Sequence, residues 1–215
     1  LNQHSGSSTG DIAMLSRPRP CRFRIGAAAL LLPALLAVSG LAHADWELRN
    51  SSRVSYVSIK NNAIAETNVF TGVTGSVNKK GEVAISIDLS SVETQVEIRN
   101  QRMRDLFFEV ARYPKATITA QFEAEELAQV NSGAPLQIIK PMKLSLHGVE
   151  ADVDAHVSIV SVGNRAWVST VKPILISAGD FGLDGGVEAL REIAGLQAIS
   201  SAVPVSVDLR LQKKK

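Results

Sequence analysis

Alternation of apolar and polar residues with a period of two dominates this chain and most constrains its fold. Every second residue of Val203–Leu211 is Val or Leu, and the same pattern recurs in 83–89, 116–122, 142–147 and 153–159. Successive side chains of a β-strand point to opposite faces, so each run predicts a strand with one apolar face. Weaker strand candidates are 53–60, 68–77 and 166–177.

Turn signals separate these runs at short intervals. Lys79-Lys80-Gly81, Asn131-Ser132-Gly133 and Gly163-Asn164 stand between candidate strands, and Gly148–Ala151 links two runs closely enough for a hairpin. Strands that follow one another in sequence, each with one apolar face, indicate an antiparallel sheet. About eight such strands either close into a barrel or stack as a sandwich, so we predict an all-β domain.

Two segments have helical rather than strand periodicity. Asp184–Ala194 has a candidate cap at Asp184, and Gly195 suits the position after its C-terminus. Arg102–Arg112 has one apolar stripe, made of Met103, Leu106, Phe107 and Val110. Phe108 lies off that stripe, and we expect it either to turn into the barrel interior or to pack, with Phe107, against neighbouring loops.

The N-terminal region is typical of an exported protein. Met14 precedes four arginines, an apolar run over 25–41 and the small-x-small site Ala42-His43-Ala44. We expect residues 1–13 to be an over-extended, disordered N-terminus and residues 14–44 to be a cleaved signal peptide. The mature protein is then periplasmic and begins at Asp45, the alternative being an uncleaved N-terminal anchor.

Cleavage changes the charge balance and the cysteine content. The chain has 23 Lys and Arg and 21 Asp and Glu, of which residues 1–44 hold four and one, so 19 basic and 20 acidic residues remain. This net charge of −1 disfavours nucleic acid as a partner. The only cysteine, Cys21, lies in the signal, so no disulfide or thiolate site is expected. Residues 45–211 form one predicted domain, and 212–215 form a basic tail.

No motif after residue 44 predicts catalysis. G-x-S-x-G, P-loop and G-x-G-x-x-G patterns are missing there, and Asp152 and Asp154 are interpreted as a solvated strand edge. A hairpin turning near Val149-Glu150 pairs His147 with a residue near Asp152 and sets His156 well down the strand, which disfavours a shared metal. We therefore predict no catalytic residue, no metal and no cofactor.

Four stretches, in order, resemble motifs of the YceI-like family of lipid-binding proteins. They are "RMRDLFFEVARYP" (102–114), "LSLHGVEADVDAHV" (144–157), "ISAGDFGLDGG" (176–186) and "AVPVSVDLRL" (202–211). The resemblance implies a lipocalin-like antiparallel barrel of about eight strands with two short helices. It also implies an elongated apolar tunnel for a polyisoprenoid, an isoprenoid quinone or a fatty-acid-like lipid.

Candidate ligand-binding residues follow from the alternating faces and from this resemblance. The Arg99–Arg104 cluster either contacts a pyrophosphate or carboxylate headgroup or is a solvated helix start. Candidate headgroup contacts are Arg99, Arg102, Arg104 and His147. Candidate tunnel residues are Phe70, Ile85, Phe108, Ile118, Phe122, Leu144, Leu146, Val157, Trp167 and Phe181, although the inward face at Phe70 and at Trp167 is undetermined.

The predicted function is periplasmic binding, carriage or sequestration of a long-chain amphiphile, which is the expected partner. Transient membrane contact and homodimerisation are compatible with this role. Two alternatives remain: a small periplasmic enzyme with its site at the barrel mouth, and a filled barrel that acts as a stress-related interaction module.

Overall fold

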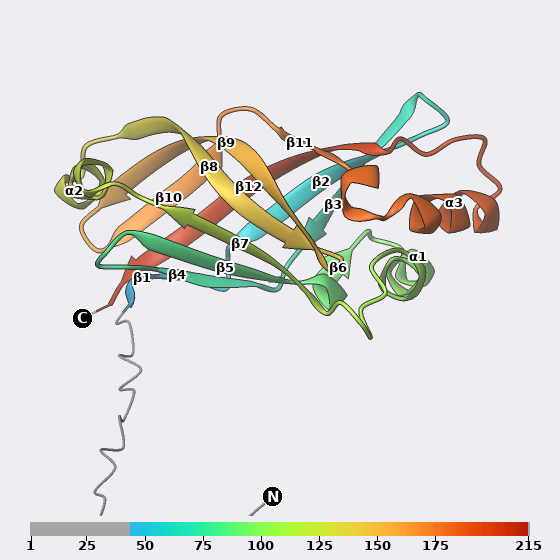
Figure 1. Ribbon diagram of the computed structural model, residues 1–215, viewed down its shortest axis with the longest axis horizontal. Coiled ribbons are helices and arrows are strands. Elements are labelled where there is room, and N and C mark those ends of the chain that lie inside the picture. The colour runs from blue at the N-terminus through green and yellow to red at the C-terminus, as the bar shows by residue number, and fades with distance from the viewer. Residues whose placement is uncertain (1–43, 215) are drawn as a thin grey trace, which may run out of the picture. The chain divides into compact units, whose positions relative to one another are not determined.

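Twelve strands and three short α-helices make up residues 44–214, the part of the chain that the computed structural model describes (Figure 1). The expected disordered N-terminus and signal peptide lie outside the described residues, apart from Ala44, which begins the first strand. The strands are β1 (Ala44–Leu48), β2 (Arg53–Lys60), β3 (Ile64–Phe70), β4 (Val73–Asn78), β5 (Glu82–Asp88), β6 (Val92–Glu93), β7 (Lys115–Gln121), β8 (Leu136–Leu146), β9 (Val149–Val162), β10 (Arg165–Thr170), β11 (Ile174–Ser177) and β12 (Ala202–Lys213).

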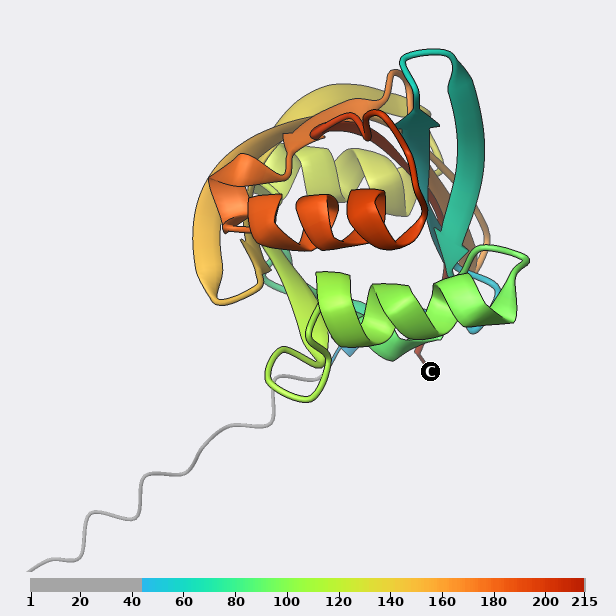
Figure 2. The same cartoon turned by 90° about the vertical axis from the view of Figure 1, so that its right-hand side faces the viewer.

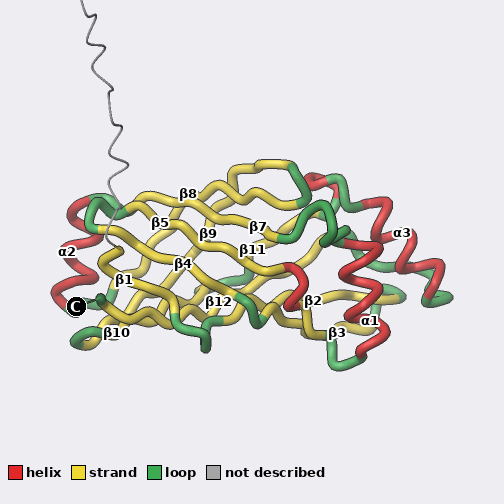
Figure 3. Tube along the Cα trace, turned by 90° about the horizontal axis from the view of Figure 1, so that it is seen from below, coloured by secondary structure: helices red, strands yellow, loops and turns green. Residues whose placement is uncertain are grey.

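Eight of these strands close into an antiparallel barrel. Their order is β1-β4-β5-β7-β8-β9-β10-β12, and β12 pairs with β1 to complete the circle. Figure 3 shows the strands winding obliquely along the barrel. We call these eight strands the belt; because it is closed, none of them has an unpaired edge along the belt. The predicted eight-stranded lipocalin-like barrel is confirmed, and the sandwich is excluded.

Strand β12 extends the barrel beyond its eight-stranded belt. Its second half lies between β10 and β1, where Leu211 faces Ala166 and Leu48. Its first half lies between β11 and β2, where Val205 faces Ile174 and Tyr56. The β2–β3 hairpin therefore prolongs the wall past the end of β1, and the short strand β6 pairs with β3.

Helices lie at both ends of the barrel. α1 (Glu97–Arg102) and α3 (Asp184–Ile193) cross one end, where the β2–β3 hairpin projects (Figures 1 and 2). α2 (Ala124–Ser132) lies at the other end, against β8 and β9. The predicted helix is confirmed, and Gly195 adopts the expected left-handed conformation, with φ of 62°. The predicted cap is wrong, because the helix already includes Asp184, and Leu183 is at the N-cap position without a side-chain cap hydrogen bond.

The first helix differs from its prediction. It begins at Glu97 and continues as a π-helical turn over Met103–Phe107 instead of running to Arg112. The Phe108 N–H donates to the Met103 carbonyl at 2.9 Å, which is the i to i+5 bond of a π turn. Glu109 then adopts a left-handed conformation, with φ of 46°, and this ends the helix. Val110 is consequently not on a helical stripe.

Four further features depart from the predicted elements. Helix α2 was not expected: a capping box of Glu123 and Glu126 starts it, and Gly133, with φ of 86°, ends it. The candidates 68–77 and 166–177 each contain two strands, which separate at 71–72 and 171–173. β12 continues to Lys213, which pairs with Trp46, so residues 212 and 213 belong to the barrel and not to a tail.

Candidate functional site

A cavity of about 570 Å³ runs through the barrel. Five alternating residues of β12 line it, from Val203 to Leu211. These ends are eight residues apart, which corresponds to about 26 Å of strand. The cavity is therefore elongated along the barrel, and its volume falls within the usual range of roughly 300–1,000 Å³ for ligand pockets.

The wall of the cavity is made of apolar side chains from the inward faces of the strands. Alternation explains this directly, because on β8 Met142, Leu144 and Leu146 point inward while Lys143 and Ser145 do not line the cavity. Eight of the ten candidate tunnel residues line the cavity: Phe70, Ile85, Phe108, Ile118, Phe122, Leu144, Leu146 and Val157. Their contact with a ligand stays a prediction.

The other two candidates do not line the cavity. Trp167 faces outward and is 39% exposed, because its neighbours on β10, Ala166 and Val168, take the inward positions. Phe181 is almost fully buried, but it packs with Ala178 and Leu183 behind the wall. Its role is to support the wall.

Both phenylalanines of the Phe107-Phe108 pair line the cavity. Phe108 is the more buried, and its ring lies 5.5 Å from that of Phe70 on β3. Phe107 lies against α3, where a Cβ added at Gly186 would stand 3.0 Å from its Cδ2 atom. Two consecutive side chains at the end of the π turn therefore face one space and are supported by different elements.

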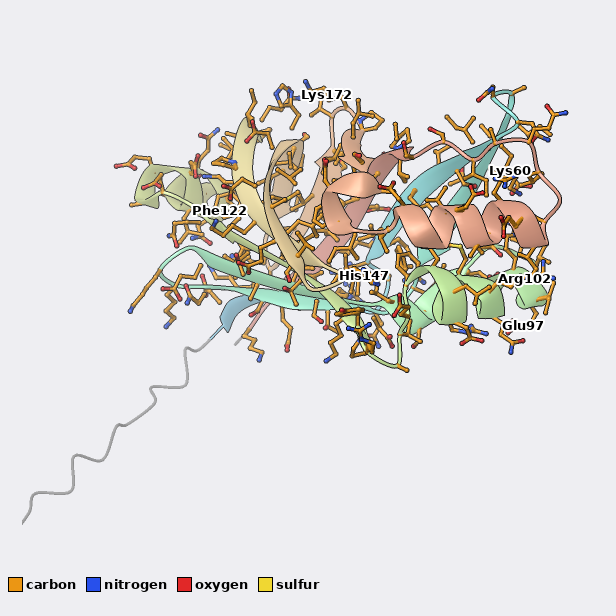
Figure 4. All side chains as sticks on the ribbon, turned by 45° about the vertical axis from the view of Figure 1, so that its right-hand side comes forward. Lys60, Glu97, Arg102, Phe122, His147 and Lys172 are labelled. Atoms are coloured by element: carbon orange, nitrogen blue, oxygen red, sulfur yellow. The ribbon has the colours of Figure 1, made fainter. Side chains whose placement is uncertain are left out.

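The end of the cavity at α1, α3 and the β2–β3 hairpin carries apolar side chains that are exposed to solvent. Val96 and Ile98 of the α1 region and Ile193 of α3 line the cavity and are also exposed. We call these three residues the apolar rim. At the opposite end, Phe122 lies near α2 (Figure 4). Lys140 extends across the Phe122 ring and pairs with Glu126 at 2.6 Å.

Basic residues gather near the apolar rim, and most of them are already paired. Lys60 and Arg99 line the cavity, and both form salt bridges with Glu66. The hydrogen bond from Lys60 holds the pKa of the Glu66 carboxyl below its usual range, and Arg99 contributes to the same effect. Arg102 also lines the cavity; Figure 4 shows it on α1.

Arg104 and His147 do not reach the cavity. Arg104 pairs with Glu97 at 2.7 Å on the outside of α1. His147 forms the tip of the β8–β9 hairpin with Gly148, and φ values of 53° and 79° indicate a two-residue turn that pairs Leu146 with Val149. The turn therefore precedes the predicted position near Val149-Glu150. The His147 ring packs at a tilt against that of Tyr113, with centroids 4.3 Å apart. Neither Arg104 nor His147 lines the cavity, and a headgroup role for either stays a prediction.

The sequence-based prediction missed several polar residues of the cavity wall, and Tyr56 and Asn68 are two of them. Tyr56 on β2 and Asn68 on β3 are cross-strand partners, line the cavity and are 8% and 4% exposed. A signal for them exists in the alternation itself, because Val54 and Phe70 begin an inward face that continues through Tyr56 and Asn68.

The described residues contain neither a metal-binding cluster nor a membrane-spanning helix. Between residues 44 and 214, no three His, Cys, Asp or Glu side chains are grouped to hold a metal ion. In the same range, no helix has the length and apolar character needed to cross a membrane.

The closed antiparallel barrel and its elongated apolar cavity define a lipocalin-like binding fold. Residues 46–211 match the YceI-like domain, and the chain belongs to this family. A comparison with curated proteins finds no match.

Solved structures support this assignment. A polyisoprenoid binding domain from Saccharophagus degradans, implicated in plant cell wall breakdown, is 34% identical, with a TM-score of 0.76 over 80% of this chain and 100% of that one. BcnA of Burkholderia cenocepacia is 18% identical, with a TM-score of 0.59 over 76% and 98% of the two chains. The YceI protein of Campylobacter jejuni is 17% identical, with a TM-score of 0.51 over 69% and 85%. The last two show a shared fold.

Proposed function

We propose that this protein binds a long-chain amphiphile in the barrel cavity and carries or sequesters it in the periplasm. A polyisoprenoid, an isoprenoid quinone or a fatty-acid-like lipid suits the space. The observation that carries the proposal is the continuous apolar lining along about 26 Å of β12. This role is one of binding and needs no catalytic residue.

The energetics favour a long chain. Burial of a CH₂ group stabilises a complex by about 0.8 kcal/mol, so a chain of about twenty carbons offers about 16 kcal/mol. Association costs roughly 4–15 kcal/mol in lost translational and rotational freedom. A chain much shorter than the cavity would therefore bind weakly, whereas one that fills it retains a surplus.

Two further observations support the ligand class and the compartment. The Saccharophagus degradans relative is described as polyisoprenoid binding and is 34% identical over most of this chain. The arginines, the apolar run and the Ala42-His43-Ala44 site have the pattern of a secretory signal peptide.

The apolar rim is the proposed route of ligand entry. Val96, Ile98 and Ile193 are exposed at the same end of the barrel at which they line the cavity. Transient contact of this rim with a membrane would let an acyl or prenyl chain enter without crossing water.

Mass spectrometry of an organic extract tests the proposal. The protein is purified without detergent after expression of the full chain, and the solvent extract is compared with that of an unrelated exported protein. We expect one enriched long-chain lipid in near-stoichiometric amount. An extract that matches the control, from protein whose cavity also fails to take up added lipid, would refute the proposal.

A further inference from the structure

The cavity-facing side of the β2–β3 hairpin changes from apolar to polar along its length. Its cross-strand pairs are Val54–Phe70, then Tyr56–Asn68, then Ser58–Glu66, which lies nearest the hairpin tip of the three. The first pair is wholly apolar and belongs to the main core. The second pair is where polar atoms first appear on an otherwise apolar, buried wall.

Both members of this pair have a buried polar atom without a partner. The Tyr56 hydroxyl oxygen and the Asn68 Oδ1 atom have no hydrogen-bond partner among residues 44–214, although both side chains are more than nine-tenths buried. Buried polar groups are nearly always satisfied in native proteins, because an unpaired one loses its hydration without compensation. The Asn68 amide nitrogen does have a partner, since it donates to Ser58 Oγ at 3.2 Å.

The chemistry of the two atoms defines what would satisfy them. Burial raises the pKa of the Tyr56 phenol well above its usual range, so the hydroxyl stays protonated and can donate. The Asn68 Oδ1 atom can only accept. A hydroxyl group both accepts and donates, whereas a carbonyl or an ether oxygen only accepts and leaves Asn68 unpaired.

An anionic headgroup fits this position poorly. Glu66 lies two residues beyond Asn68 on the same face of β3, about 7 Å along the strand. It already pairs with Lys60 and Arg99, so a phosphate would have to displace it from those cations. Arg102 is the remaining cavity-lining arginine through which an anion could bind, and it therefore supplies the competing account.

We propose that Tyr56 and Asn68 form a subsite for the uncharged, hydroxyl-bearing headgroup of the bound lipid. A long-chain alcohol or a phenol-type headgroup has this chemistry. The inference rests on the proposed function and adds the headgroup class and its location. The tail would occupy the apolar cavity beyond Phe70, and the hydroxyl would lie between the barrel and the apolar rim.

Three probes with one C20 prenyl chain test the subsite on delipidated protein: geranylgeraniol, its methyl ether and its diphosphate. We expect the wild type to bind the alcohol about tenfold more tightly than the ether, which corresponds to about 1.4 kcal/mol. We also expect it to prefer the alcohol to the diphosphate. Tyr56→Phe and Asn68→Leu should each reduce the preference for the alcohol over the ether without lowering the melting temperature of ligand-free protein. Ser55→Ala, on the opposite face of β2, is the matched control and should retain the preference for the alcohol over the ether.

Four other outcomes would contradict the proposed hydroxyl subsite. Unchanged alcohol affinity in Tyr56→Phe, which adds no atoms and should fold, would mean that only water occupies the subsite. A preference for the diphosphate that disappears in Arg102→Gln would replace the subsite with an anion site. Binding of all three probes without discrimination would refute the subsite and leave the proposed function intact. Binding of none of them to the wild type would refute the subsite and exclude a prenyl chain as the ligand, and the extract test above then decides the proposed function.

Discussion

Phe107 and Phe108 meet edge to face, with ring centroids 4.7 Å apart and ring planes at 75°. The π turn brings these consecutive residues to the same cavity, but their supports differ. Phe108 packs on Phe70 of the β2–β3 hairpin, whereas Phe107 packs on Gly186 of α3. Phe108 therefore joins the π turn to the barrel wall, and Phe107 joins it to α3 at the end of the cavity.

Truncation of the two rings should separate these roles. Phe108→Ala should destabilise ligand-free protein by about 3 kcal/mol, near the lower end for a buried Phe, because a cavity already lies beside it. Phe107→Ala should cost less, since that side chain is only partly buried. Both variants should retain less lipid, because both rings line the cavity. Urea unfolding and lipid content after identical purification measure the two effects. A larger stability loss in Phe107→Ala would contradict this assignment.

Two adjacent glycines of α3 provide a matched test of the contact between that helix and the π turn. A Cβ at Gly186 would lie 3.0 Å from the Phe107 Cα atom, whereas a Cβ at Gly185 meets nothing within 4 Å. Gly185→Ala should stabilise the protein by up to about 1 kcal/mol through helix propensity. Gly186→Ala should lose that gain through overpacking and be destabilised by about 1–3 kcal/mol relative to Gly185→Ala.

The measurement for the glycine pair is thermal unfolding together with the rate of lipid release. We expect faster release in Gly186→Ala, because displacement of α3 loosens the end of the cavity. Equal stability and equal release rates in the two variants would show that α3 does not depend on close contact at Gly186.

Glu66 should make stability pH-dependent. Its pKa is lowered in the folded protein, chiefly by the Lys60 hydrogen bond, so its contribution is present above the unfolded-state pKa and is lost as pH falls through the folded-state value. Glu66→Gln should therefore lower the melting temperature at pH 7, and the gap from wild type should close in acid below about pH 4. Glu125→Gln, on the exposed side of α2, controls for general charge removal. A gap that stays constant from neutral pH into acid would exclude this linkage.

His147 should be dispensable for lipid binding. Its φ of 53° suits asparagine, which tolerates the left-handed conformation better than most residues. His147→Asn should therefore keep the hairpin turn and the lipid content, whereas Gly148→Ala should destabilise the protein, because the new Cβ would lie 3.0 Å from Tyr113 Cε1. Loss of lipid in a stably folded His147→Asn variant would support a headgroup role for this residue.

The strands could be predicted because they alternate, whereas the choice of a barrel over a sandwich came from the resemblance to the YceI-like family. The clear runs at 83–89, 116–122 and 203–211 all became strands with their apolar residues on the cavity wall. Alternation defines two faces but does not say which faces inward when both carry apolar residues. On β10, Ala166 and Val168 compete with Trp167, and the smaller side chains point inward. The structure thereby decides the face at Trp167 that the sequence left undetermined.

The cavity end was harder to predict than the belt of strands. The apolar stripe in 102–112 predicts a regular α-helix, and nothing in that spacing indicates the i to i+5 bonding of the π turn. Helix α2 had a readable signal, the Glu123–Glu126 capping box, but its C-terminal Gly133 was interpreted as a loop tip. Alternation could have placed Tyr56 and Asn68 on the inward faces of their strands, but their pairing across β2 and β3 cannot be read from either strand alone.

The most direct test of lipid carriage is native mass spectrometry of freshly purified protein with one residue added inside or outside the barrel. Ala120→Phe places a ring in the cavity, whereas Thr119→Phe places it on the outer face of the same strand, β7. We predict that the wild type and Thr119→Phe carry one lipid-sized mass that collisional activation releases, and that Ala120→Phe carries far less of it. Bare polypeptide mass in the wild type, or equal lipid in both variants, would contradict a lipid-binding cavity.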